Sequence, residues 1–154
     1  MKILDILPRE ELVAASLQGA TKADVVRELA EHLARQYPEI EADRLIHDLW
    51  ERERLGSTAI GDGIAIPHGK LAGLNGVRGA FGRHVAGVDF ESLDGNPTRL
   101  FFVLVAPEDS VGQHLKALAR VSRLLKDGAF RNRLIAAPDR GELFRLIREE
   151  DEKL

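Results

Sequence analysis

The sequence predicts an α/β fold, a three-layer α/β/α sandwich around a mixed central sheet, built as a single domain over residues 1–154. Three observations favour this fold class. First, apolar residues recur at helical spacing near both ends of the chain. Second, this periodicity disappears between Gly56 and Gly95, where most of the fourteen glycines lie. Third, Leu100–Ala106 is apolar without interruption. A strand that is apolar throughout is usually covered on both faces, so helices are expected on both sides of the sheet.

Two amphipathic helices are expected before the sheet. Thr21 and Asp24 stand three residues apart, as an N-cap residue and its partner do, and Tyr37-Pro38 ends the pattern that follows them. A second helix would end at Gly56, because glycine often terminates helices. The apolar positions of the two helices are Val25, Val26, Leu29, Ala30 and Leu33, and then Ala42, Leu45, Ile46, Leu49 and Trp50.

The glycine-rich middle supplies the strands, and three helical patterns close the chain. Asp94-Gly95-Asn96-Pro97 is a strong turn signal that precedes the strand over Leu100–Ala106. The acidic end, Glu149–Glu152, is expected to be a solvated helix terminus. Other β-compatible fragments lie around 64–66, 77–85 and 88–90, and the closing helices are expected around 115–125, 130–135 and 143–147.

The composition excludes several classes of protein. The 22 Lys and Arg residues against 25 Asp and Glu give a net charge of −3, whereas a nucleic-acid binder normally carries a basic excess. The absence of cysteine rules out a disulfide scaffold, a thiolate nucleophile and a Cys-based zinc site. No apolar run approaches the roughly 20 residues that span a bilayer, and the first residues do not resemble a signal peptide. We therefore expect a cytoplasmic protein that is not membrane-embedded and binds no nucleic acid.

The segment from Arg52 to Gly69 carries the strongest candidates for chemistry, and His68 is the first of them. Pro67 fixes its own φ and Gly69 has no β-carbon, so the sequence predicts a stiff, open turn around the histidine rather than a packed face. A free imidazole has a pKa near 6.5 and is therefore mostly neutral and nucleophilic at pH 7. The same pattern also fits a turn histidine without a chemical function.

Other residues of this segment could hold an anion, and each of them also has a structural explanation. Ser57 and Thr58 could donate hydroxyl or amide hydrogen bonds to the anion, or could simply cap a turn. Arg52 lies in the last turn of the second helix, where the helix dipole favours any cation, but a nearby anion would use its forked guanidinium. Gly61 and Gly63 form an incomplete phosphate-loop pattern, for which two turn glycines are the simpler interpretation.

The four remaining histidines have different expected roles. His114 is placed in the first turn of a helix, where the helix dipole favours a neutral imidazole and attracts anions, although a plain first-turn residue fits equally well. His32 is expected to be a half-buried packing residue and His47 to be exposed, and His84 has no evident partner. No two of them have the spacing of a metal-ligand pair on a helix, so we expect no metal site and no cofactor.

Together these residues resemble a known family, the enzyme IIA domain of the fructose/mannitol type in the bacterial phosphoenolpyruvate-dependent phosphotransferase system. The similarity is greatest to its nitrogen-regulatory subgroup, and it covers roughly Leu4 to Ile147. It implies that residues 1–154 form one enzyme IIA type-2 domain with the sandwich fold expected above. The segments that carry the resemblance are Arg52–Thr58 and Gly61–Lys70, supported by Asp94-Gly95-x-Pro97, Phe101–Val105, Pro107 and His114-Leu115.

The resemblance also implies a chemistry for the site. His68 would accept a phosphoryl group from the phosphohistidine of an HPr-type carrier protein, and would hold it as a phosphohistidine. His114 would be the second active-centre histidine, placed to hydrogen-bond the phosphoryl oxygens. Arg52 would be the active-centre arginine, and Ser57 and Thr58 would supply the phosphate-side hydroxyls.

Three functions remain open under this resemblance. A regulatory protein would change its binding to target proteins, such as kinases or potassium transporters, with its phosphorylation state; the patterns Leu-Gly-Ser-Thr and His-Gly-Lys-Leu favour this function. A sugar-specific enzyme IIA would instead pass the phosphoryl group to an enzyme IIB during fructose or mannitol uptake. A sensory domain of the same fold would never be phosphorylated. Because a carrier must dock briefly, an apolar rim is expected around the site, and its candidates, each of which could also be core, are Leu55, Ile60, Ile64 and Leu71.

Overall fold

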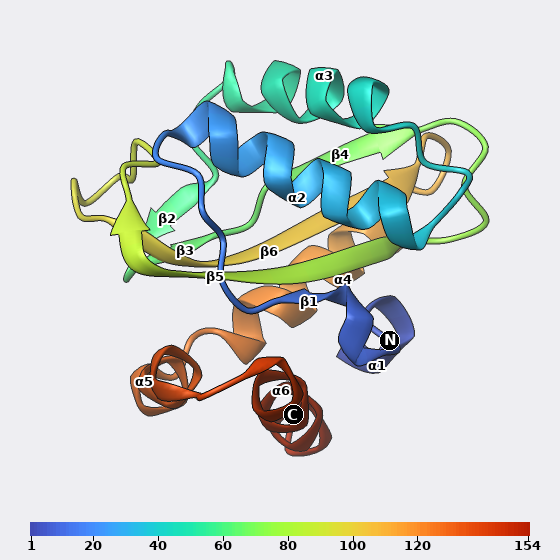
Figure 1. The fold of residues 1–154 in the computed structure, drawn as a ribbon. Coiled ribbons are helices and arrows are strands. Elements are labelled where there is room, and N and C mark those ends of the chain that lie inside the picture. The colour runs from blue at the N-terminus through green and yellow to red at the C-terminus, as the bar shows by residue number, and fades with distance from the viewer.

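A six-stranded sheet lies between two layers of helices in the computed structural model, which describes residues 1–154 (Figure 1). Helices α2 and α3 cover one face of the sheet, and α4, α5 and α6 lie on the other (Figure 1). The predicted α/β/α sandwich is therefore confirmed. These five helices are α2 (Lys22–Gln36), α3 (Ala42–Glu53), α4 (Val111–Leu124), α5 (Gly128–Ala136) and α6 (Arg140–Glu152).

The sheet is mixed, as predicted, because its longest strands run antiparallel while their neighbours run parallel. The strand order is β1-β5-β6-β3-β2, and β4 also pairs with β6. Strand β6 runs parallel to β3 and β4 and antiparallel to β5. Its residues 100–106 are at most 1% exposed, which explains their uninterrupted apolar character. The strands are β1 (Val13–Ala14), β2 (Ala59–Gly61), β3 (Ile64–Ala65), β4 (His68–Leu71), β5 (Arg78–Val88) and β6 (Thr98–Pro107).

The local signals of the two long N-terminal helices are confirmed. Thr21 caps α2 and accepts a hydrogen bond of 3.2 Å from the backbone N–H of Asp24. Helix α3 ends just before Gly56, whose φ of +144° lies in the region that favours glycine. No helix of the protein combines the length and the apolarity that a bilayer crossing requires.

The structure corrects the sequence analysis at several short elements. Helix α1 (Ile3–Ile6), the 3₁₀ turn η1 (Glu10–Leu12), and strands β1 and β4 were not expected. Strand β5 is continuous over Arg78–Val88, where two separate fragments were predicted. Pairing with β6 covers residues 78–83 and resumes at Val88 after an irregularity in register, so one strand spans both predicted fragments.

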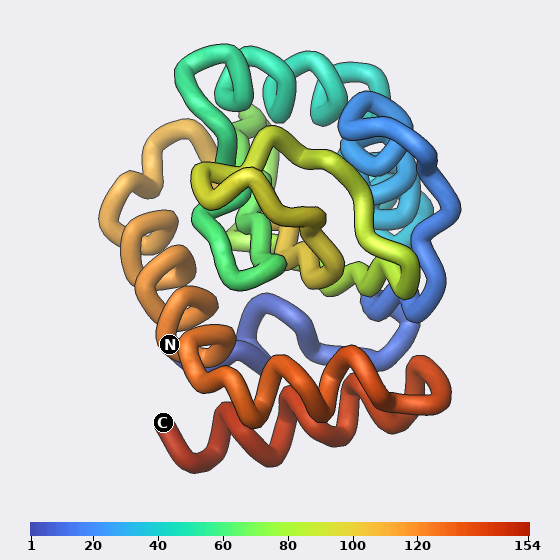
Figure 2. Tube along the Cα trace, turned by 90° about the vertical axis from the view of Figure 1, so that its left-hand side faces the viewer, coloured from blue at the N-terminus to red at the C-terminus, as the bar shows by residue number.

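The acidic end of the chain is not simply solvated, because Asp151 is fully buried. Its carboxylate accepts hydrogen bonds from the backbone N–H groups of Ile3 at 3.0 Å and Leu4 at 3.3 Å, and forms an ion pair of 2.8 Å with Arg120. These contacts tie the last helix to the first, and the two chain ends lie close together (Figures 1 and 2).

Candidate functional site

Three elements bring Arg52, His68 and His114 together at one end of β4. His68 is the first residue of β4 and pairs in register with Leu104 of β6, while Arg52 comes from the last turn of α3. His114 comes from the start of α4, where its N–H donates to the carbonyl of Ser110. His68 was expected on an open turn, but it begins a strand and is half-buried, because pairing with β6 draws this segment into the sheet.

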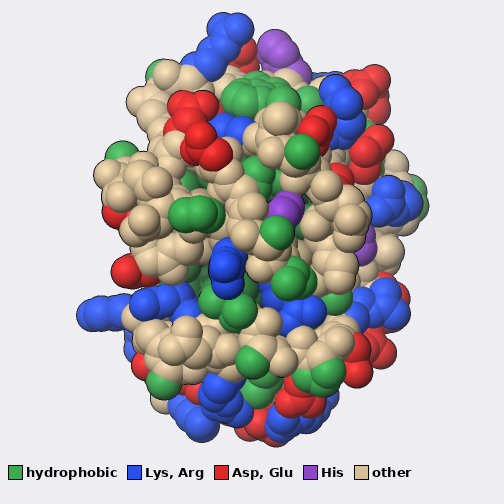
Figure 3. Space-filling view, turned by 60° about the vertical axis from the view of Figure 1, so that its left-hand side comes forward, with side chains coloured by type: hydrophobic (Ala, Val, Ile, Leu, Met, Phe, Trp, Pro, Cys, Tyr) green, Lys and Arg blue, Asp and Glu red, His purple; other side chains and the backbone are tan.

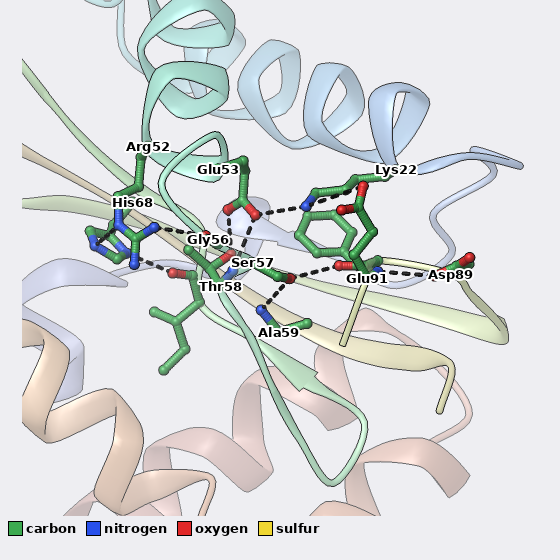
Figure 4. Close-up of polar contacts among 12 residues, drawn as sticks. Lys22, Arg52, Glu53, Gly56, Ser57, Thr58, Ala59, His68, Asp89 and Glu91 are labelled. Atoms are coloured by element: carbon green, nitrogen blue, oxygen red, sulfur yellow. Dashed lines mark hydrogen bonds and ion pairs between the residues drawn. The ribbon is translucent and has the colours of Figure 1, made fainter. Parts of the chain in front are cut away.

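Hydrogen bonds define which ring nitrogen of His68 is available. Nδ1 lies 2.8 Å from the carbonyl oxygen of Ile66, and because a carbonyl can only accept, Nδ1 carries the hydrogen. Nε2 is then unprotonated, and it accepts a hydrogen bond of 3.2 Å from Nε of Arg52 (Figure 4). The lone pair of Nε2 is therefore directed at the guanidinium, and Nε2 is the only ring nitrogen that has a lone pair with which to attack an electrophile.

The two histidines lie close together, and burial favours the neutral form of each. Their ring centroids are 5.3 Å apart, with the rings tilted by 58°. Burial is the main cause that lowers the pKa of His68, and the Arg52 cation adds to it against the opposing effect of the Ile66 carbonyl. Burial likewise lowers the pKa of His114, assisted by His68 and Lys70. Both imidazoles therefore favour the neutral form at pH 7.

The other two candidates for phosphate contacts, Ser57 and Thr58, have their hydroxyls engaged elsewhere. The Ser57 hydroxyl donates to the carbonyl of Phe90 at 2.7 Å and accepts from the N–H of Ala59 (Figure 4). Thr58 is 4% exposed, and its hydroxyl donates to the carboxylate of Glu53. Neither residue lines the cavity at His68. Their phosphate-side role stays a prediction, and it would require both hydroxyls to change partners.

A cavity of about 570 Å³ lies in front of His68, bounded by α3, β4 and α4. Its rim includes Leu55, which is 84% exposed, and Leu115, which is 60% exposed. The prediction that Leu55 is a rim residue is therefore confirmed, whereas Leu115 was missed. The cavity is lined by Asp48, Glu51, Arg52, Leu55, His68, Gly69, Lys70, His114, Leu115 and Leu118.

The remaining rim candidates lie elsewhere. Ile64 and Leu71 are core residues, because they are only 4% and 7% exposed. Ile60 is exposed on β2 but does not line the cavity. On the side of the molecule that carries β2, hydrophobic side chains form separate small patches among charged and polar surface (Figure 3).

Of the histidines outside the site, His84 differs most from expectation. It is buried between two backbone groups, with Nε2 2.8 Å from the carbonyl of Gly19 and Nδ1 accepting from the N–H of Gly87. Gly19 lies 65 residues away in the chain and Gly87 only three, so the sequence could not reveal the first of these partners. His32 is half-buried and His47 exposed, as predicted. No three His, Asp or Glu side chains converge as a metal site would require.

Two carboxylates beside the site were missed by the sequence analysis. Asp48 of α3 accepts a hydrogen bond of 2.7 Å from the N–H of Lys70 in β4. Glu53 follows Arg52 in the chain, and its carboxylate is buried with Lys22 at 3.0 Å. Arg52 and Glu53 are adjacent in the motif Arg52–Thr58, but only the fold reveals what Glu53 contacts.

Comparisons with known proteins agree on one family. The sequence profile described as "Phosphoenolpyruvate-dependent sugar phosphotransferase system, EIIA 2" matches residues 7–150. A nitrogen regulatory protein of Bradyrhizobium diazoefficiens is 40% identical over 147 residues, covering 96% of this chain and 95% of that protein. The crystal structure of nitrogen regulatory protein IIA-Ntr from Neisseria meningitidis superposes with a TM-score of 0.83 at 29% identity, covering 90% of this chain and 94% of that one. The mannitol enzyme IIA of Escherichia coli was solved in complex with phosphorylated enzyme IIB. It superposes with a TM-score of 0.74 at 22% identity, covering 90% of this chain and 95% of that one.

Proposed function

This chain belongs to the EIIA 2 family of the phosphoenolpyruvate-dependent sugar phosphotransferase system, and from that premise we propose that it is a phosphoryl-accepting regulatory protein with Nε2 of His68 as the acceptor. One observation carries the choice of atom. The Ile66 carbonyl holds the hydrogen on Nδ1, so Nε2 presents a lone pair in a half-buried site beside a guanidinium. A neutral, oriented imidazole nitrogen is the form that attacks phosphorus.

The transfer would exchange one N–P bond for another. The Nε2 lone pair attacks the phosphorus of a phosphohistidine on an HPr-type carrier, and the electron pair of the breaking N–P bond returns to the carrier's imidazole. The phosphoryl group carries about −2 charge. Arg52 would exchange its bond to Nε2 for charge-assisted bonds to the phosphoryl oxygens, and His114 lies close enough to contribute a further one. Positioning and electrostatic stabilisation would account for the rate.

The surroundings of His68 support docking of a protein donor. Leu55 and Leu115 expose apolar surface in the lining of the cavity, which also contains the charged residues Asp48, Glu51 and Lys70. A mixed apolar and charged rim suits a small transient interface. We propose that an HPr-type carrier docks there, and that the target proteins of the regulatory function are sensitive to the charge added at His68.

The regulatory function is preferred over sugar transport because of the relatives. The nitrogen regulatory relative aligns over nearly its full length at the higher identity, whereas the mannitol enzyme IIA shares chiefly the fold. The second candidate is a sugar-specific enzyme IIA that passes its phosphoryl group to an enzyme IIB. A chase experiment separates them: a phosphorylated sugar-specific protein loses its label to a fructose or mannitol enzyme IIB within seconds, and a regulatory one retains it.

A mass measurement tests the proposal itself. The protein is incubated with phosphoenolpyruvate, enzyme I and an HPr-type carrier, and the intact mass is recorded. We expect an adduct of about 80 Da on the wild type and none on His68→Ala, with His47→Ala as the control that still accepts. Absence of the adduct with every cognate carrier would leave the sensory domain as the function, and an adduct on His68→Ala would move the acceptor to another residue.

A further inference from the structure

The orientation of the Arg52 guanidinium depends on an exposed turn that joins α3 to β2. Nη1 of Arg52 donates to the carbonyl oxygen of Gly56 at 2.8 Å, while its Nε reaches His68 (Figure 4). The carbonyl therefore fixes the direction of the guanidinium. The turn itself has little packing, because Leu55 is 84% exposed and no atom lies within 4 Å of where a β-carbon on Gly56 would stand. Polar contacts must therefore hold this turn, and two of them are the bond from the Ser57 hydroxyl to the carbonyl of Phe90 at 2.7 Å and the bond from the Gly56 N–H to the carbonyl of Glu53 at 3.1 Å.

The carboxylate of Glu53 holds the same turn from its buried side. Its Oε1 accepts a hydrogen bond of 3.1 Å from the N–H of Thr58, and its Oε2 accepts from the Thr58 hydroxyl (Figure 4). Glu53 and Thr58 are the residues on either side of the turn over 54–57, so these bonds close it into a loop. The carbonyl of Gly56 lies within that loop.

The carboxylate of Glu53 is compensated by a cation that is itself buried. Nζ of Lys22 lies 3.0 Å from Oε1, and the side chains are only 8% and 1% exposed. The ammonium also lies 4.9 Å from the ring centre of Phe90 and 5.9 Å from that of Trp50. A buried ion pair is seldom the most stable solution for a core position, since apolar residues of similar volume often do as well or better. Its presence one residue from Arg52 therefore calls for a role beyond packing.

We propose that Glu53, neutralised by Lys22, is a positioning residue for phosphoryl transfer: it holds the 54–57 turn so that the Gly56 carbonyl directs Arg52 onto the acceptor nitrogen of His68. The inference rests on the proposed function for its kinetic consequence. It does not make Glu53 a catalytic residue, because its carboxylate contacts Thr58 and Lys22 rather than the reacting atoms.

Glu53→Gln tests the proposal in two independent measurements. In the first, phosphoryl transfer from the phosphorylated carrier is followed at varied carrier concentration. Since a small misplacement of a positioning group slows the chemical step, we expect the maximal rate to fall about tenfold or more while the KM for the carrier stays unchanged. In the second, imidazole and guanidinium NMR signals are recorded on the unphosphorylated protein. The Nε–H signal of Arg52 is expected to broaden by exchange with water, and Nε2 of His68 to move toward the shift of a nitrogen without a hydrogen bond.

Two further variants keep the test independent of stability. In Glu53→Gln the Lys22 ammonium keeps only Glu91, at 3.9 Å, as an anionic partner. The double variant Lys22→Met/Glu53→Gln removes this buried ammonium and should recover thermal stability without recovering the transfer rate. Asp151→Asn is the matched control, because it disrupts another buried ion pair, with Arg120, on the opposite layer. It should lower stability and leave both the rate and the NMR signals of the site unchanged.

The outcomes separate the two proposals. A wild type that accepts no phosphoryl group contradicts the proposed function, and the NMR arm still decides whether Glu53 orients Arg52. Unchanged Arg52 and His68 signals in Glu53→Gln overturn the positioning role. It is also overturned if Asp151→Asn slows transfer as much as Glu53→Gln does, or if the double variant recovers the full rate.

Discussion

The carboxylate of Asp48 occupies the space beside Gly69 in which a β-carbon at that position would have to stand. Oδ2 of Asp48 accepts its hydrogen bond from the next residue, Lys70, at 2.7 Å. Strand β4 pairs only with β6, so this bond attaches the other edge of β4 to α3. The glycine after His68 is thus explained by the close approach of a neighbouring helix and not by backbone freedom, since Gly69 does not have a positive φ.

Gly69→Ala should destabilise the protein by displacing Asp48. The loss of the bond to Lys70 predicts a fall of about 1–2 kcal/mol in the free energy of unfolding, measured by urea denaturation. Asp48→Ala removes the obstructing carboxylate, so the double variant should cost clearly less than the sum of the two single ones. If the losses in free energy of unfolding are additive, the methyl group that Gly69→Ala adds clashes with a group other than the Asp48 carboxylate.

Arg52→Lys should impair transfer although it preserves the charge. A lysine cannot donate in two fixed directions, as the guanidinium does toward His68 and Gly56. Loss of an oriented charge-stabilising donor predicts a decrease in the rate of phosphoryl transfer of about a hundredfold, measured by rapid quench. The control is Arg54→Lys, because the Arg54 side chain is 75% exposed and pairs only with Glu51 at 3.6 Å. Equal rates of phosphoryl transfer for the two variants would show that Arg52 has no role in the reaction.

The site should remain active somewhat below neutral pH. Burial lowers the pKa of both His68 and His114, so their NMR titrations are expected to have midpoints below 6.5 in the folded protein. In the unfolded chain both residues return to an ordinary pKa of about 6.5. The unfolded state then binds more protons as the pH falls, so these histidines lower the free energy of unfolding progressively below about pH 6.5. Midpoints at or above 6.5 in the folded protein would contradict the burial seen here.

Polar substitutions on the cavity rim should weaken carrier docking without affecting the fold. Leu55→Ser and Leu115→Ser each remove exposed apolar surface, and a docking contact of ordinary strength predicts a rise in the KM for the carrier of about fivefold. Steady-state phosphorylation at varied carrier concentration measures it. Leu93→Ser is the control, because Leu93 is 77% exposed but does not line the cavity. A similar KM for all three variants would place the docking surface elsewhere.

The fold class was accessible from sequence because its signals are local and repeated. The spacing of apolar residues in α2 and α3 indicates which face of each helix is buried. The uninterrupted apolar run at 100–106 indicates that both faces of that strand are buried. Strand β4 gave no such signal, since a four-residue segment after a proline becomes a strand only through its pairing with β6. Helix α1 was missed for a related reason: its first N–H groups are satisfied by Asp151, at the other end of the chain.

The candidate site was predictable in composition but not in contacts. Arg52, His68 and His114 were singled out by residue type and resemblance, and the structure places them together. The hydroxyls of Ser57 and Thr58 illustrate what sequence cannot provide, because their acceptors lie on Phe90 and Glu53 and only folding brings these groups into reach. Hydrogen-bond direction is decided by such neighbours and not by residue identity.

The group that orients the ring of His68 is only two residues away from it. The Ile66 carbonyl bonds Nδ1 of His68 across a single intervening proline, whose ring restricts the geometry of that tripeptide. The tautomer of His68 is consequently set by the backbone of its own segment and not by any side chain around the opening of the cavity. The leucines and charges there can therefore be exchanged for others, as new binding partners would demand, while Nδ1 keeps its hydrogen and Nε2 its lone pair.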